Sequence, residues 1–411
     1  RVLPEKQRID DRVAELFVPV ILIISLLTFF IWVFFGGIDV VSHGLFAALS
    51  VLVVACPCAV GLATPVALAA GLNKAARNHI LIRDTSALEQ MRNVDVVVFD
   101  KTGTLTEGHP TVIGWLWAQG QEEHYKDVLL AAESTSDHPL AEAIVTALEG
   151  EEQVIPAHLD GFENITGKGV RVAYQGAEYW VGSHKLLKDY QANLSDILAN
   201  MLTQYESDGN SIVYFGREND LLAVIAIKDQ LRVTSMEAIR ELRIQDIEIC
   251  MLTGDGERTA SSVAGSLGIM RFVADAMPDD KEDFIHKLQL QGKTVAMVGD
   301  GVNDAQALSC ADVSIAMGKG TDTLMDTAMI TLRTSDLLLL PKVFRLSRQT
   351  VSLMYRNLFW AFIYNTVGIF VAAGVLYPVY DILLSPALAG AAMALSCVSV
   401  ALSSLRLSSR F

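Results

Sequence analysis

The stretch VDVVVFDKTGTLT, residues 94–106, decides how this 411-residue chain folds. Its apolar first half predicts a buried β-strand that ends at Phe99, so Asp100 stands at the carboxyl end of that strand. Ligands of open parallel α/β sheets bind at this end. An aspartate carboxylate placed there can attack a phosphoryl group and hold it as an acyl phosphate. Because hydroxyl and backbone N–H groups follow in residues 102–106, they can approach the phosphate oxygens.

Two further apolar segments, in the second half of the chain, end in similar chemistry. Residues 247–252 run into Thr-Gly-Asp at 253–255, and residues 294–298 run into Gly-Asp-Gly-Val-Asn-Asp at 299–304. Apolar strands that alternate with helical patterns predict a parallel sheet with crossover helices. The carboxyl ends of such strands meet at one edge, so the motifs would form an oxygen-rich pocket there. Mg²⁺ prefers such ligands together with phosphate oxygens.

A Cys-Pro-Cys triplet at residues 56–58 lies inside the uncharged run 44–73. That run is long enough to cross a bilayer, which requires ~20 apolar residues. Proline breaks a helix, and in lipid a break is tolerated only where the freed backbone is buried or lines a site. The thiols of Cys56 and Cys58, with the freed carbonyls, therefore predict a site for a soft metal ion. The alternative is a pair of buried cysteines beside a helix kink.

The composition predicts a protein with both membrane and soluble parts, because 51% of residues are hydrophobic and the mean hydropathy is +0.36. Four uncharged stretches could span a bilayer: 17–35, 44–73, 357–380 and 382–405. Lys and Arg cluster on the side of the large insertion between the second and third spans, which places that insertion in the cytoplasm. A net charge of −15 argues against a nucleic-acid partner. Five cysteines, two of them within a span, indicate free thiols rather than a disulfide framework.

The DKTGTLT motif and the Cys-Pro-Cys triplet together resemble the heavy-metal (type IB) P-type ATPases. The segments TGD (253–255), MPDDK (277–281) and GDGVND (299–304) resemble motifs of the same family, although Gly256 stands where the family usually has Asn. The resemblance implies that Asp100 is the phosphorylated nucleophile and that Lys281 offsets developing negative charge. It implies a catalytic set of Asp100, Lys101, Thr102, Thr253, Gly254, Asp255, Lys281 and Asn303. It also implies a Mg²⁺ set of Asp100, Thr102 through its carbonyl, Asp300 and Asp304.

Residues 136–141, SDHPLA, resemble the Ser-x-His-Pro-Leu motif of the heavy-metal subfamily. The resemblance implies that ATP binds in the inserted domain, with His138 orienting the nucleotide. Glu133, Gly167 and Gly169 would line the adenine site, since small residues permit close approach of a flat purine. The alternative reading of His138-Pro139 is a helix start with proline in the first turn.

The last two expected spans contain neither Lys nor Asp, whereas the Zn²⁺ and Cd²⁺ pumps of the subfamily carry both. Cu(I) is soft and accepts two or three largely sulfur ligands. Tyr364-Asn365 and the segment MALS (393–396) resemble signatures of the copper subgroup, with Cys397 in place of its second serine. The resemblance implies Cu(I) or Ag(I) as transported ion, held by Cys56, Cys58, Tyr364, Asn365, Met393, Ser396 and Cys397. Cys397 could also be a small core residue.

The expected fold class is membrane helices plus α/β: four transmembrane helices with a haloacid-dehalogenase-like phosphorylation domain that an α+β nucleotide-binding domain interrupts. The expected parts are a linker from an actuator domain outside this chain (1–16), a hairpin with the triplet (17–73), a stalk and first catalytic half (74–110), the nucleotide-binding domain (111–228), the second catalytic half (229–341), and a second hairpin with a tail (342–411). The chain would thus correspond to the carboxyl-terminal part of a pump that also has earlier membrane helices.

The expected function is ATP-driven export of Cu(I), or of Ag(I), through an aspartyl phosphate, with ATP and Mg²⁺ as cofactors. The protein would lie in the plasma (inner) membrane with its catalytic domains in the cytoplasm, where a copper chaperone could be a partner. One alternative is a Zn²⁺ or Cd²⁺ exporter. Another is a non-transporting phosphohydrolase, which typically needs a second Asp where this chain has Thr102. A metal-binding scaffold is the third, but it leaves the DKTGTLT motif unexplained.

Overall fold

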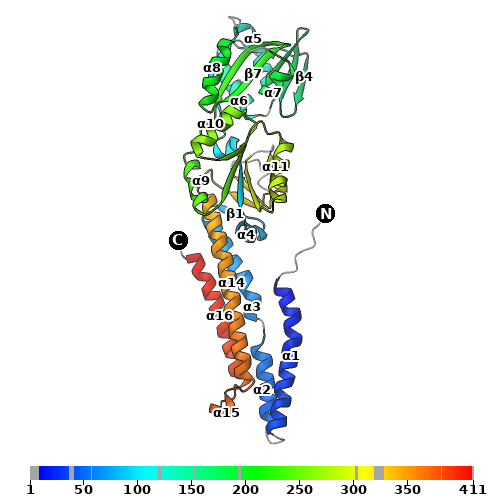
Figure 1. Ribbon diagram of the computed structural model, residues 1–411, viewed down its shortest axis with the longest axis vertical. Helices are drawn as coiled ribbons and strands as arrows, with labels where there is room; N and C mark the ends of the chain where they lie inside the picture. Colours follow the sequence, from blue (N-terminus) through cyan, green and yellow to red (C-terminus); the bar gives the residue numbers. More distant parts are fainter. Residues whose placement is uncertain are drawn as a thin grey trace. The chain divides into compact units, whose positions relative to one another are not determined.

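The computed structural model describes residues 9–36, 41–56, 58–118, 122–136, 138–151, 154–192, 196–300, 304–318, 328–380 and 382–409 (Figure 1). The chain divides into two compact units. The helical unit comprises Arg1–Asn78 and Arg345–Phe411, and the α/β unit comprises His79–Phe344.

The helical unit contains long apolar helices whose large side chains face outward. Its helices are α1 (Ile9–Gly36), α2 (Val41–Val54), α3 (Cys58–Arg77), α14 (Leu339–Ala372, which begins in the other unit), α15 (Tyr377–Tyr380) and α16 (Pro386–Ser409). Leu26, Phe30 and Phe34 on α1 are more than half exposed. Such a surface is unfavourable in water and suits contact with lipid.

Three segments of the described residues are long and apolar enough to cross a membrane: Val18–Phe35, Val41–Arg77 and Pro386–Arg406. They overlap the expected spans 17–35, 44–73 and 382–405. The expected span 357–380 does not meet the same test. Its helix α14 ends at Ala372, and a turn separates it from α15, so the uninterrupted apolar helix is shorter than the sequence pattern indicated.

The α/β unit is built around a seven-stranded sheet in the order β1-β13-β12-β11-β2-β9-β10. The strands are β1 (Ile80–Ile82), β2 (Val96–Asp100), β9 (Glu248–Leu252), β10 (Arg271–Val273), β11 (Val295–Gly299), β12 (Val313–Met317) and β13 (Ile330–Leu332). All neighbours run parallel except β1 and β13. Helices α4 (Ser86–Met91), α9 (Ser235–Ile244), α10 (Glu257–Leu267), α11 (Pro278–Leu290) and α12 (Ala305–Cys310) belong to this part. Its central strands are buried throughout, which explains their continuous apolar sequence.

A second sheet is formed by the segment between β2 and α9. This six-stranded antiparallel sheet has the order β3-β8-β7-β6-β5-β4. Its strands are β3 (Thr111–Trp117), β4 (Gly161–Ile165), β5 (Gly169–Tyr174), β6 (Ala177–Gly182), β7 (Ser211–Arg217) and β8 (Asp220–Lys228). Helices α5 (Glu122–Glu133), α6 (Pro139–Glu149), α7 (His184–Asp189) and α8 (Asp196–Ser207) accompany it. The first and last strands of this segment, β3 and β8, pair with each other.

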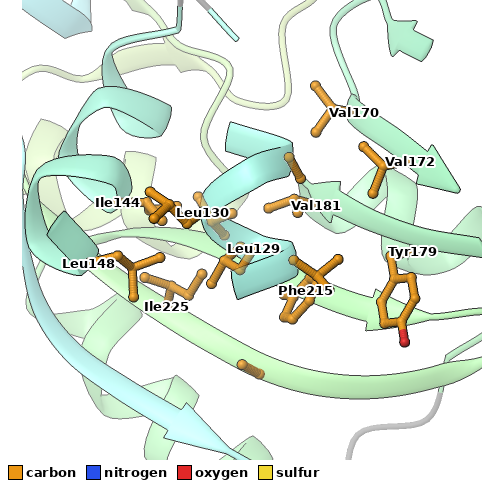
Figure 2. Packing of buried hydrophobic residues seen from close by; sticks show 14 of the residues in the cluster. Leu129, Leu130, Ile144, Leu148, Val170, Val172, Tyr179, Val181, Phe215 and Ile225 are labelled. Atoms are coloured by element: carbon orange, nitrogen blue, oxygen red, sulfur yellow. The ribbon is translucent and has the colours of Figure 1, made fainter. Parts of the chain in front are cut away.

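The core of the second sheet joins helical and strand side chains. Leu129 and Leu130 of α5 and Ile144 of α6 pack toward Phe215 and Ile225 of the sheet (Figure 2). All five side chains are essentially inaccessible to solvent. Burial of each such side chain contributes about 1.5–3 kcal/mol to folding. The segment therefore has a hydrophobic core of its own, separate from that of the seven-stranded sheet.

Candidate active site

Three neighbouring strands of the seven-stranded sheet deliver acidic or hydroxyl side chains to one edge. Asp100 ends β2, which lies between β9 and β11. Asp100 stands opposite Leu252, so Thr253 and Asp255 follow directly beyond it. Strand β11 ends one residue before Asp300. The parallel sheet predicted from the apolar segments is confirmed, and it brings the three sequence motifs to the same edge.

The turn after β2 is η2 (Lys101–Leu105). Its backbone at Gly103 lies against Asp300, the residue that follows β11. Thr102 is extended at φ −73° and ψ 128°, and Gly103 adopts φ 70°, a left-handed conformation that favours glycine. A β-carbon on residue 103 would lie 1.5 Å from Oδ2 of Asp300. Glycine is therefore required here both by the backbone conformation and by the approach of a carboxylate.

Lys281 of α11 joins two of the carboxylates. Its Nζ donates to Oδ1 of Asp100 at 2.6 Å and to Oδ1 of Asp304 at 2.7 Å. All three side chains are buried. Burial alone would lower the pKa of Lys281, but the two carboxylates outweigh it and raise that pKa. The ammonium group is therefore charged and lies against the nucleophile, where it can offset negative charge that develops on a phosphoryl group.

The carboxylates of Asp100, Asp300 and Asp304 form an oxygen cluster whose ligand atoms lie within 4.8 Å of one another. Burial, followed by the charges of Asp100 and Asp304, raises the pKa of Asp300 to about 7. Three carboxylates at such short range repel one another unless a cation or protons compensate. The donor set consists of hard oxygens only, so it fits Mg²⁺.

Lys101 makes the other buried ion pair of the site, with Asp255. Thr253 donates through Oγ1 to Oδ2 of Asp255 at 2.9 Å. Burial alone would raise the pKa of Asp255, but the charge of Lys101 outweighs it, so that pKa is lowered. Gly254, between Thr253 and Asp255, is exposed at the same edge. Gly256 precedes α10, and a β-carbon there would meet no atom within 4 Å. Crowding therefore does not explain why glycine stands here in place of the family's usual Asn.

Sequence reasoning missed three residues that hold the nucleophile loop. Arg232 donates through Nε to the carbonyl of Thr104 at 3.0 Å and also to that of Gly103. Asp229 accepts a hydrogen bond from the hydroxyl of Thr106 and another, at 3.1 Å, from the N–H of Gly108. Ser211 of β7 accepts a hydrogen bond from Nζ of Lys101 at 3.1 Å. These partners lie more than a hundred positions away in the chain, so no local sequence signal identifies them.

The four expected nucleotide-site residues lie in the inserted segment. His138 precedes α6, and its Nδ1 accepts a hydrogen bond from the N–H of Leu140 at 3.2 Å, with Pro139 in the first turn. The imidazole is nevertheless exposed, so it caps a helix and still reaches solvent. Glu133 ends α5 and is buried, which raises its pKa to about 7. When protonated, the Glu133 carboxyl group can donate as well as accept a hydrogen bond.

The two glycines of this set have structural reasons of their own. Gly169 has φ 144°, and a β-carbon there would lie 2.1 Å from the carbonyl oxygen of Val181 on the neighbouring strand. Gly167 has φ 70°, and a β-carbon there would lie 2.7 Å from the methyl group of Met277. Both positions therefore require glycine whether or not a purine approaches them.

The expected transported-metal residues lie in the helical unit. The sulfur atoms of Cys56 and Cys58 lie against each other, with the two Cα atoms 5.5 Å apart, so the two expected metal-binding side chains converge here. Helix α2 ends at Val54 and α3 begins at Cys58, so the triplet lies at an interruption between the two helices. Pro57 lies outside the described residues.

The remaining expected metal residues divide into buried and outward-facing groups. Asn365 and Ser396 are buried, and Nδ2 of Asn365 and Oγ of Ser396 have no hydrogen-bond partner among the described residues. Cys397 packs with Ala59 and Val60 of α3, close in sequence to the triplet. Met393 is half-buried. Tyr364 is half exposed beside Trp360, so the structure does not bring it into the interior. The last expected catalytic residue, Asn303, lies outside the described residues.

An aspartate at the end of a central parallel strand, with a lysine and two more carboxylates around it, defines a phosphoryl-transfer domain of the α/β class. Residues 94–312 match the family model of the haloacid dehalogenase-like hydrolases, and this chain belongs to that family.

Curated relatives narrow the assignment. The chain is 43% identical over 401 residues to a "Copper-exporting P-type ATPase" of Legionella pneumophila, covering 98% of this chain and 54% of the relative. It is 44% identical over 410 residues to a "Silver exporting P-type ATPase" of Salmonella typhimurium, covering 98% of this chain and 49% of the relative. This chain thus spans about half the length of the curated relatives it matches.

Solved structures agree with this assignment. The crystal structure of a zinc-transporting PIB-type ATPase in the E2·Pi state matches with a TM-score of 0.70 at 32% identity, over 98% of this chain and 64% of that one. The catalytic domain of the CPx-ATPase CopB-B matches with a TM-score of 0.55 at 28% identity, over 66% of this chain and 97% of that one. The resemblance to metal-transporting P-type ATPases is confirmed. Together with the apolar helices, it identifies an integral membrane protein.

Proposed function

We propose that this chain carries the phosphorylation, nucleotide and metal sites of an ATP-driven exporter of Cu(I), or of Ag(I), that works through a phosphorylated Asp100. The observation that supports the chemistry best is the contact of Lys281 with both Asp100 and Asp304 at the carboxyl edge of the sheet. Desolvation of a buried lysine and two buried aspartates is costly, so their placement at this edge favours a role in the chemistry over a purely structural one.

The proposed reaction uses groups that already lie at this edge. Lys281 holds Oδ1 of Asp100, and we assign the other oxygen, Oδ2, to the attack on the γ-phosphorus of ATP. The new bond is Oδ2–P, the bond between that phosphorus and the bridging oxygen breaks, and ADP leaves with the electron pair. Thr253 and Gly254 hold the transferred group, while Lys101 and Lys281 offset its charge.

Mg²⁺ would be held by the carboxylates of Asp100, Asp300 and Asp304 and by the carbonyl of Thr102. When bound, it would neutralise charge on the phosphate oxygens and on the carboxylate cluster. We assign Asn303 to ordering this shell. We further propose that ATP reaches Asp100 from the inserted segment, where His138, Glu133, Gly167 and Gly169 receive the nucleotide.

For the transported ion we propose a site formed by Cys56 and Cys58 in their reduced form, with Asn365, Met393, Ser396 and Cys397 nearby and Tyr364 as an outer contributor. The two unpartnered polar groups, Asn365 Nδ2 and Ser396 Oγ, support a site in the helix interior, because a buried polar group without a partner is costly. Cys397 touches the helix that begins at Cys58. The names of the curated relatives favour copper or silver, whereas one of the structural relatives transports zinc.

We place the α/β unit in the cytoplasm and the helices in the plasma (inner) membrane, following the positive-inside rule. The cytoplasm would supply ATP and reduced copper, and a copper chaperone there would deliver the ion, since Cu(I) binds thiols tightly.

The deciding experiment measures phosphorylation of Asp100 from γ-labelled ATP under reducing conditions, in the presence of Cu(I), Ag(I), Zn²⁺ or Cd²⁺. We expect Cu(I) and Ag(I) to change the phosphorylated fraction and the double variant Cys56→Ser/Cys58→Ser to lose that response. A response to Zn²⁺ or Cd²⁺ alone would replace copper by a divalent ion and keep the ATPase assignment. Absence of any acid-stable, hydroxylamine-sensitive label would favour a non-transporting phosphohydrolase.

A further inference from the structure

Helices α11 and α12 carry a second group of metal-ligand side chains, distinct from the carboxylate cluster. Glu282, His286 and Cys310 each offer one ligand atom, and the three atoms lie within 4.8 Å of one another. Glu282 and His286 are four residues apart on α11 and therefore share one helix face. Cys310 is the last residue of α12. Its Sγ lies 3.4 Å from Oε1 of Glu282, and Nε2 of His286 lies 3.5 Å from the same oxygen.

A neighbouring glutamine fixes which nitrogen of His286 is available. The amide nitrogen of Gln289 donates to the carbonyl of Cys310 at 2.9 Å and to Oδ2 of Asp312 at 3.2 Å. The amide oxygen of Gln289 therefore faces the other way, and it lies 3.2 Å from Nδ1 of His286. Since an amide oxygen can only accept, Nδ1 carries the proton. The lone pair is then on Nε2, which faces Glu282 and Cys310.

We propose that Glu282, His286 and Cys310 bind a zinc-class divalent ion, with the fourth coordination position open to water. One thiolate, one imidazole and one carboxylate are a typical donor set for tetrahedral Zn²⁺. An outer hydrogen bond that orients the imidazole, here from Nδ1 to Gln289, is the usual companion of such a site. Mg²⁺ would avoid the sulfur and nitrogen atoms, and Cu(I) would gain little from the carboxylate. Binding would displace the proton of Cys310 into solvent.

The site would join two helices that both carry groups of the active site. Lys281 is the residue immediately before Glu282 on α11, and Asp304 is the residue immediately before α12. Lys281 donates to Asp304 between the same two helices. An ion that bridges Glu282 and Cys310 would therefore add a second connection between α11 and α12, at the end of α12 opposite Asp304. The proposal does not depend on the ion that the helical unit transports.

The test uses the full chain in detergent, in the Cys56→Ser/Cys58→Ser background so that the helical unit contributes no paired thiols, and with excess Mg²⁺ to occupy the carboxylate cluster. Co²⁺ is added as the spectroscopic probe for zinc. We expect one Co²⁺ per chain with a thiolate-to-cobalt charge-transfer band and the visible bands of tetrahedral cobalt, and we expect Zn²⁺ to displace it. Zn²⁺ should also raise the unfolding temperature by roughly 2–4 °C.

The variants Cys310→Ser and His286→Gln should each lose the charge-transfer band or shift it, and each should lose the thermal stabilisation by Zn²⁺. His158→Gln, at another exposed histidine, is the matched control and should bind cobalt as the parent does. If Cys310→Ser failed to fold, His286→Gln would still decide, because its side chain is half exposed. A band that survives both variants, cobalt binding without a thiolate band, or binding of Cu(I) but neither Co²⁺ nor Zn²⁺ would each overturn the proposal.

Discussion

Gly103 and Asp300 approach so closely that no side chain fits between them: a β-carbon on residue 103 would lie 1.5 Å from Oδ2 of Asp300. The contact couples the loop that carries the nucleophile to the end of the neighbouring strand. The Asp300 carboxylate cannot retreat from Gly103 without leaving Asp100 and Asp304, the other members of the carboxylate cluster.

We therefore expect Gly103→Ala to reduce phosphorylation from ATP by at least about 10²-fold, because a displacement of ~1 Å at the reacting groups has that effect. The residue would also be strained at φ 70°. Gly265→Ala in α10 is the control, since a β-carbon there meets nothing within 4 Å, and it should leave the rate unchanged. The measurement is the initial rate of labelling at saturating ATP. Normal labelling of Gly103→Ala would show that the loop and Asp300 can separate without consequence.

Replacing Lys281 by Gln should lower the phosphorylation rate by about 10²–10³-fold, the usual effect of removing one charge-stabilising donor. The variant leaves Asp100 and Asp304 without the cation that both contact. Lys287→Gln, at an exposed position of the same helix, should behave as the parent. Single-turnover labelling separates this effect from ATP affinity. A loss confined to affinity would move Lys281 from the transferred phosphoryl group to nucleotide binding.

The raised pKa of Asp300 predicts a pH dependence of stability in the absence of Mg²⁺. Its folded-state pKa is about 7, against an ordinary value of 3.8, so between these values the folded state binds more protons than the unfolded state. Stability is then highest below pH ~4 for this group and decreases as the pH rises through about 7. Asp300→Asn should therefore stabilise the metal-free protein at pH 8, on the order of 1–3 kcal/mol, and give no gain near pH 4.

Thermal unfolding followed by circular dichroism at both pH values measures this effect. Asp283→Asn, at an exposed position of α11, is the control and should show no such dependence. Added Mg²⁺ should reverse the order and stabilise the parent over Asp300→Asn at pH 8. Equal stability of parent and variant at pH 8, with and without Mg²⁺, would mean that the charge of Asp300 is not destabilised by burial and by its acidic neighbours. It would also mean that Asp300 is not a metal ligand.

His138 permits a separation of its two roles. Asn is a good helix N-cap, so His138→Asn should keep the cap on α6 while removing the imidazole. We expect weaker ATP binding by roughly tenfold, an unchanged unfolding temperature, and intact phosphorylation by inorganic phosphate. His158→Gln is the control. Equal loss of phosphorylation from ATP and from inorganic phosphate would remove His138 from the nucleotide site.

Asn365 tests the metal site in the helices. Its buried Nδ2 has no partner among the described residues, so Asn365→Leu should not destabilise the fold and should reduce the response of phosphorylation to Cu(I). Cys397→Ser should cost little, because it restores the serine common in the copper subgroup. A severe loss of the copper response in Cys397→Ser would instead make Cys397 a ligand. The readout is the Cu(I) concentration at half-maximal effect.

The parallel strands could be predicted from the sequence because each is a continuous apolar run that ends in a polar motif. The expected segments 247–252 and 294–298 differ by a residue or less at each end from β9 (Glu248–Leu252) and β11 (Val295–Gly299). Burial of these strands on both faces accounts for their continuous apolar sequence. The family and the enzyme class could be predicted for the same reason, since the motifs stand at the ends of these strands.

Contacts between distant segments could not be predicted in this way. Arg232 lies in an ordinary polar stretch, and only the folded chain brings it to the carbonyl groups of Gly103 and Thr104. The edge strand β1 is three residues long and antiparallel to β13, a pattern too short to recognise. The roles of Asp100, Lys281 and Asp304 in phosphoryl transfer stay predictions, because their contacts show where the groups lie and not the reaction itself.

The pairing of β3 with β8 has a mechanical consequence. Thr111 and Lys228, where the inserted segment begins and ends, are register partners, so the two chain connections of the insertion lie side by side. A two-stranded ribbon bends easily across its flat face but resists shear within its plane, because shear would break the ladder of hydrogen bonds. We expect the insertion to rock about this pair of strands once its other contacts, such as that of Ser211 with Lys101, are released. A nucleotide carried on the insertion would then approach Asp100 along an arc.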